Sequence, residues 1–91
     1  MSYRVSFSSH AERDFKKLTP DIQGRLRPRI DALGENPRPH GVEKLGGQNR
    51  YRIRVGNYRV VYHIHDDVLI VLVVGIGAAI AHQVHGAIGF T

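Results

Sequence analysis

The feature that most constrains the fold is the stretch RYRIRVGNYRVVYHIH, in which polar and apolar residues alternate on both sides of a two-residue interruption. Alternation with a period of two is typical of a half-buried β-strand. The interruption is Gly56-Asn57, and both residue types accept the positive φ that a tight hairpin turn requires. The sequence therefore predicts a β-hairpin whose strands flank this turn.

The rest of the chain supplies two helical segments and two more strands. Thr19-Pro20 is a helix start signal, a capping hydroxyl followed by proline at the first helical position. The expected elements are a strand at 3–7, helices at 8–18 and 19–34, a loop at 35–49, hairpin strands at 50–55 and 58–65, and an aliphatic strand at 68–74. The order β-α-α-β-β-β predicts an α+β domain in which a small antiparallel sheet packs against an N-terminal helical hairpin.

The length and composition of the chain limit the number of domains and exclude several classes of functional site. Its 91 residues suffice for one hydrophobic core but not for two, so residues 1–91 are expected to form a single domain. The absence of cysteine excludes disulfides, cysteine zinc sites and thiol nucleophiles. No apolar run approaches the ~20 residues that span a bilayer, so we expect a cytoplasmic protein without a membrane partner.

The charge of the chain is positive and unevenly distributed. Its 13 Lys and Arg outnumber its 8 Asp and Glu, and all of these cations precede residue 60. A basic surface favours a polyanionic partner such as nucleic acid. In the hairpin, a period of two places Arg50, Arg52 and Arg54 on one face. Such a row could follow the phosphates of RNA or DNA, or it could simply face solvent, and the spacing alone leaves both open.

Histidines supply the remaining candidates for chemistry. Arg59 shares its strand face with His63 and His65, which could act as acid and base in RNA cleavage, grip a metal, or form an ordinary strand pair. No third metal ligand is evident, and no metal site is predicted. The segment 75–91 contains His82 and His85 among small and apolar residues, and it could pack on the sheet or mediate self-association.

Four stretches carry a resemblance to a known family. They are YRVSFSSHAERDFKKL, the helical joint LTPDIQGRLRPRI, the connection ENPRPHGVEKLGG, and YRIRVGNYRVVYHIHDD followed by VLIVLVV. With them the chain resembles the RelE/ParE superfamily of toxins from type II toxin–antitoxin systems, and specifically its RelE-type members, over residues 2 to about 77.

The resemblance implies an mRNA interferase, a ribosome-dependent endoribonuclease that inhibits translation without a metal or other cofactor. Its partners would be mRNA in the ribosomal A site, 16S rRNA and a cognate RelB-like antitoxin, which we expect in the groove between helices and sheet. Carried over by position, Arg52, Arg54 and Arg59 would bind the phosphate and stabilise its extra charge during attack of the 2′-hydroxyl. We expect Arg50 and Lys44 to bind RNA as well.

The C-terminal segment departs from the family pattern. Relatives usually carry a catalytic arginine and a tyrosine after the last strand, whereas this chain has alanine in place of the arginine and His85 in place of the tyrosine. The departure predicts weak or absent cleavage, unless His82 or His85 has taken over proton transfer. Two alternatives stay open, namely a ParE-like inhibitor of DNA gyrase and a non-catalytic regulator that only binds the antitoxin.

Overall fold

The computed structural model describes residues 2–78, so residue 1 and residues 79–91 are outside this description. Its elements are β1 (Arg4–Phe7), α1 (Ser9–Lys16), α2 (Pro20–Asp31), the short 3₁₀ helix η1 (Ala32–Gly34), β2 (Glu43–Lys44), β3 (Arg50–Val55), β4 (Tyr58–His65) and β5 (Ile70–Ala78). The hairpin and its turn form as predicted. No helix within residues 2–78 is long and apolar enough to cross a membrane.

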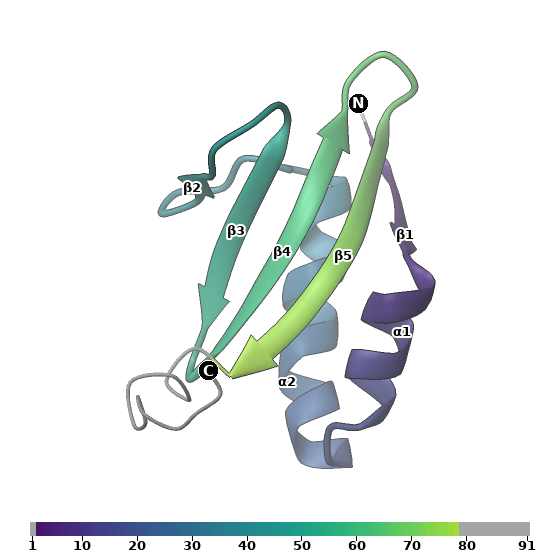
Figure 1. Cartoon of the computed structure of the whole chain (residues 1–91), viewed down its shortest axis with the longest axis vertical. Helices are drawn as coiled ribbons and strands as arrows, with labels where there is room; N and C mark the ends of the chain where they lie inside the picture. Colours follow the sequence, from purple (N-terminus) through teal and green to yellow (C-terminus); the bar gives the residue numbers. More distant parts are fainter. Residues whose placement is uncertain (1, 79–91) are drawn as a thin grey trace.

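One five-stranded sheet organises the molecule, in the order β1-β5-β4-β3-β2. Both helices lie on the same face of it, and the opposite face carries no helix of the described chain (Figure 1). The predicted α+β class is confirmed, but β1 pairs with β5 in parallel, so the sheet is mixed where the sequence predicted an antiparallel one. Strand periodicity reveals which residues share a face and carries no information on the direction of a distant partner strand.

Local capping explains where the helices begin. The Ser8 hydroxyl accepts a hydrogen bond from the backbone N–H of Ala11 at 3.1 Å. The Thr19 hydroxyl accepts one from Ile22 at 3.4 Å, and Pro20 follows as the first helical residue. These contacts satisfy backbone donors that have no partner inside the helix. The helical hairpin is therefore set by its own sequence.

The hydrophobic core lies between the helices and the sheet. Apolar side chains from α2, η1 and the inner face of the central strands are buried together. The largest fully buried ones are Leu26, Ile30, Leu33, Val60, Tyr62, Ile64, Val71 and Val73. On β4, from Val60 onwards, every second residue is buried and the residues between are half-buried. This alternation directs the other half of β4 to the helix-free face.

The last strand differs from its predicted range at both ends. Leu69 has a φ of 55° and stays in the turn, so β5 begins at Ile70. The strand then continues through Ala78, beyond the predicted limit at residue 74, with a bulge opposite Val61 and Tyr62. Residues 75–78, assigned from the sequence to an atypical tail, are thus part of the sheet. The predicted packing or self-association of the remaining tail falls outside the described residues.

Candidate nucleic-acid interface

Four arginines gather on the helix-free face of the sheet, and we call Arg50, Arg52, Arg54 and Arg59 the arginine face. The alternating residues Tyr51 and Ile53 of β3 are buried beneath them. Strand pairing places Arg59 directly opposite Arg54 across the hairpin. The structure therefore brings together all four arginines predicted from the sequence, three from β3 and one from β4.

Arg52 has a carboxylate partner that the sequence did not reveal. The short strand β2 pairs with β3 so that Glu43 lies opposite Arg52. One oxygen of Glu43, Oε1, accepts from Nε of Arg52 at 2.7 Å and lies 2.6 Å from its Nη2. Glu43 belongs to the stretch predicted as a loop, where no periodicity marked a strand. Its spacing from Arg52 becomes meaningful only once this pairing is known.

Lys44 does not join the arginines. It pairs with Tyr51 across β2 and β3, and Tyr51 points to the helix-covered side. Its Nζ lies 5.1 Å from the centroid of the Tyr51 ring, within the range of a cation–π contact. The structure thus separates Lys44 from the arginine face, although the sequence grouped it with those residues.

His63 and His65 border the arginine face along β4. Their ring centroids are 6.2 Å apart, and His63 pairs across the hairpin with Arg50. Partial burial lowers the pKa of His63 below its usual value of 6.5, and the charges of His65 and Arg50 add to the effect. A lowered pKa keeps this imidazole neutral at pH 7, when it can accept a proton.

The other candidate histidines add no site to residues 2–78. His82 and His85 fall outside the described residues. Within the described part of the chain, no group of three or more His, Asp or Glu is arranged to hold a metal ion. What the arrangement offers is positive charge. Guanidinium groups bind phosphate through a planar fork of donors and keep their charge at any physiological pH.

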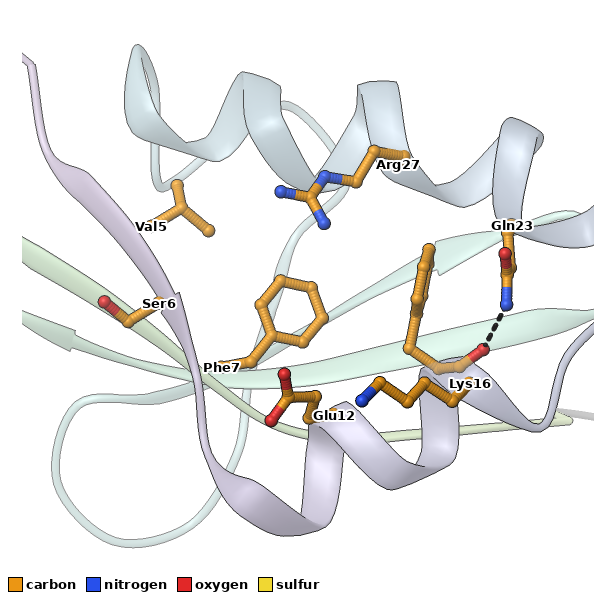
Figure 2. A pocket seen from close by; sticks show the side chains of 8 residues that line it. Val5, Ser6, Phe7, Glu12, Lys16, Gln23 and Arg27 are labelled. Carbon is orange, nitrogen blue, oxygen red and sulfur yellow. Dashed lines mark hydrogen bonds between the residues drawn. The ribbon is translucent and has the colours of Figure 1, made fainter.

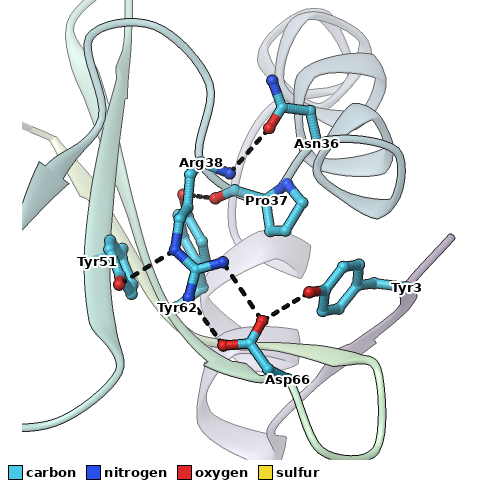
Figure 3. A network of polar contacts seen from close by, with 7 residues as sticks. All are labelled: Tyr3, Asn36, Pro37, Arg38, Tyr51, Tyr62 and Asp66. Atoms are coloured by element: carbon cyan, nitrogen blue, oxygen red, sulfur yellow. Dashed lines mark hydrogen bonds and ion pairs between the residues drawn. The ribbon is translucent and has the colours of Figure 1, made fainter. Parts of the chain in front are cut away.

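Behind the arginine face, a polar network ties the 35–49 connection to the strands (Figure 3). Arg38 donates from Nη2 to Asp66 Oδ2 at 2.9 Å and from Nε to the Tyr51 hydroxyl at 3.3 Å. Tyr3 donates to the other oxygen of Asp66 at 2.6 Å. The hydrogen bonds from Arg38 and Tyr3 lower the pKa of Asp66 below its usual range. The network links Tyr3, the residue before β1, to β3 and the β4–β5 turn.

Tyr62 anchors the same connection from inside the core. Its hydroxyl donates to the backbone carbonyl of Pro37 at 2.7 Å, and its ring stacks on Tyr51 with centroids 6.1 Å apart. Burial raises the pKa of Tyr62 to about 12, which keeps the hydroxyl protonated as a donor. The two stacked rings pack beneath β3, the strand that carries three of the four arginines.

A second surface feature lies at the edge of the sheet. A cleft of about 570 Å³ opens beside β1 and between the two helices, as Figure 2 shows. Phe7 and Phe15 meet edge to face inside it, at 5.8 Å between centroids, and the guanidinium of Arg27 lies 5.4 Å from the Phe7 ring. Glu12 and Lys16 also line it. The cleft thus combines aromatic and charged groups beside an edge strand.

Comparison with known proteins places this geometry among toxins. Residues 5–79 match the family model described as ParE toxin of type II toxin-antitoxin system, parDE. A putative RelE-like toxin protein of Escherichia coli is 30% identical over 79 residues, which cover 85% of this chain and 83% of that protein. The mRNA interferase toxin RelE of E. coli K12 is 27% identical over the same shares of the two chains.

A solved structure agrees with these sequence matches. A doubly substituted E. coli toxin RelE in complex with a peptide of the antitoxin RelB superposes with a TM-score of 0.80 and 26% identity. The alignment covers 100% of this chain and 99% of that one. The arrangement of helices and sheet described above is therefore shared with that protein.

Proposed function

Since the chain belongs to the RelE/ParE superfamily of toxins of type II toxin–antitoxin systems, we propose that it is a ribosome-dependent mRNA endoribonuclease that inhibits translation. The observation that carries this proposal is the arginine face. It places four guanidinium groups on one surface of the sheet, where each arginine is exposed or half-buried. The name of a matched relative, mRNA interferase toxin RelE, supports the same activity. Cytoplasmic mRNA is the substrate we propose.

The proposed reaction uses the RNA's own 2′-hydroxyl as nucleophile. Its oxygen attacks the adjacent phosphorus, a 2′,3′-cyclic phosphate forms, and the bond to the 5′-oxygen of the next nucleotide breaks as that oxygen takes up a proton from water. Arg52, Arg54 and Arg59 would hold the phosphate and stabilise the negative charge that grows in the transition state, which is often the largest single contribution to catalysis. A neutral His63 could accept the proton of the attacking hydroxyl.

The antitoxin is the second proposed partner. Support comes from the relatives, since several solved structures that share this fold are toxin–antitoxin complexes. The cleft beside β1 suits a disordered segment that folds on binding, because it offers aromatic side chains beside β1, which is an edge strand of the sheet formed by residues 2–78. The sequence predicted an apolar groove between helices and sheet for this partner, whereas the cleft also carries the charged side chains of Glu12, Lys16 and Arg27.

Induced expression tests the proposed activity. Primer extension on a reporter mRNA should show cuts inside translated codons, and coexpression of the antitoxin encoded with the chain should remove them. Arg52→Ala and Arg54→Ala should each lower the cleavage rate about 10²-fold or more, the usual loss when one charge-stabilising donor is removed. Arg29→Ala is the matched control, because Arg29 is an exposed arginine of α2 and lies away from the arginine face. This variant should cleave mRNA at the wild-type rate.

The tail is tested in parallel. Because the chain lacks the family's arginine and tyrosine, cleavage should be slow and should accelerate in the variant Ala81→Arg/His85→Tyr. Intact mRNA and normal growth in both versions would contradict the nuclease proposal and leave antitoxin binding as the function. Arrest without mRNA cuts, together with inhibited supercoiling by purified DNA gyrase, would instead identify a gyrase inhibitor.

A further inference from the structure

The contact between Glu43 and Arg52 places a carboxylate on the arginine face. Glu43 is one of the two residues of β2, and antiparallel pairing sets it directly opposite Arg52. Its Oε1 lies 2.7 Å from Nε and 2.6 Å from Nη2 of Arg52. The same carboxylate oxygen thus occupies the Nε edge of the guanidinium fork.

A phosphodiester would approach Arg52 through the same donors. Carboxylate and phosphate both match the planar fork of arginine and bind it through paired N–H groups. We infer that Glu43 is an internal competitor for RNA, whose carboxylate holds Arg52 until a phosphate displaces it. This inference rests on the proposed binding of RNA phosphate by the arginine face and adds a residue that regulates it.

The exposure of the pair determines how strong this competition is. The Glu43 side chain is 54% exposed and that of Arg52 is 25% exposed, so water and salt weaken their attraction. Ion pairs of this exposure contribute little stabilisation in proteins, and losing one changes an equilibrium constant by about two- to fivefold. Arg50 and Arg54 flank Arg52 on the same face and favour a ligand with several phosphates. The competitor should therefore be displaced readily by a polynucleotide and less readily by an isolated anion.

Removing the charge of Glu43 tests the inference. A fluorescently labelled single-stranded oligoribonucleotide is titrated with wild-type protein and with Glu43→Gln at several salt concentrations. We expect the variant to bind about two- to fivefold more tightly. The slope of log affinity against log salt should stay close to that of wild type, because Arg52 meets a phosphate in both complexes once Glu43 is displaced.

Two further variants make the result specific. Glu35→Gln makes the same change in net charge, and Glu35 contacts Ser2 and not an arginine of this face, so it should have a smaller effect. In an Arg52→Ala background, Glu43→Gln should lose its effect, because the group it competes for is gone. Thermal unfolding of each variant confirms that it is folded.

Other outcomes overturn the inference in distinguishable ways. Weaker RNA binding by Glu43→Gln would mean that Glu43 positions Arg52 for phosphate, which is the opposite role. If Glu43→Gln and Glu35→Gln change RNA affinity equally, net charge alone explains the change and Glu43 is not a competitor for Arg52. If Arg52→Ala binds RNA as wild type does, the arginine-face proposal itself fails, and the inference fails with it.

Discussion

Replacing Gly34 by alanine should destabilise the protein, although alanine is usually the better residue in a helical turn. Gly34 is buried at the end of η1, and its carbonyl accepts a hydrogen bond from the N–H of Tyr3 at 2.7 Å. A Cβ added there would lie 2.9 Å from the backbone oxygen of Tyr3 and 3.4 Å from Cγ2 of Val5. The nearer atom is backbone, so it cannot swing aside as a flexible side chain would.

The size of the destabilisation in Gly34→Ala depends on which backbone segment must move to make room for the methyl group. Either η1 or the start of β1 has to shift, and inserting a methyl group into a packed site of this kind typically costs about 1–3 kcal/mol. The shift would also strain the hydrogen bond between Tyr3 and Gly34, which holds β1 against the end of the helical hairpin. We therefore expect the free energy of unfolding to fall by about 1–3 kcal/mol.

Gly24 provides the matched control. It is an exposed residue inside α2, and a Cβ added there meets no atom within 4 Å. Gly24→Ala should raise the free energy of unfolding by about 0.8–1 kcal/mol, since alanine is the better helix former. Urea denaturation of both variants measures the two changes with one assay. The reasoning about the close approach to Tyr3 is refuted if Gly34→Ala is as stable as Gly24→Ala.

Two further predictions concern the network behind the arginine face. Tyr62→Phe removes the donor to the Pro37 carbonyl and should lower the free energy of unfolding by about 1–2 kcal/mol, and equal urea midpoints for variant and wild type would contradict this. The pKa of Asp66 is lower in the folded chain than in the unfolded one, so its stabilising effect is present above the ordinary pKa near 3.8 and is lost as the pH falls through the folded value. Asp66→Asn should therefore be less stable than wild type at neutral pH, and the gap should shrink in acid. A gap in unfolding free energy that stays constant from about pH 7 to pH 3 would exclude this linkage.

Much of the fold was predictable because its signals are local. Ser8 and Thr19 cap the helices through hydrogen bonds to residues three positions away, and Gly56-Asn57 forms a turn between its own neighbours. The grouping of the arginines was predictable for the same reason, since a strand period of two already places alternate residues on one face.

The features that escaped prediction depend on distant partners. The sheet became mixed because β1 and β5 pair in parallel from opposite ends of the described chain. Arg38 and Asp66 are 28 positions apart, and Glu43 meets Arg52 only because a two-residue strand forms there. No periodicity or composition marks such contacts, and the displacement of Lys44 from the arginine face has the same origin.

The parallel pairing of β1 with β5 also bears on how the chain is made. Its first strand and both helices leave the ribosome while the strand that separates β1 from β4 is still untranslated. Pairing between segments so distant in sequence raises contact order and slows folding. The growing chain must therefore keep its apolar helix faces without their final partner until translation is nearly finished. The complete sheet, and with it the assembled protein, therefore exists only at the end of synthesis.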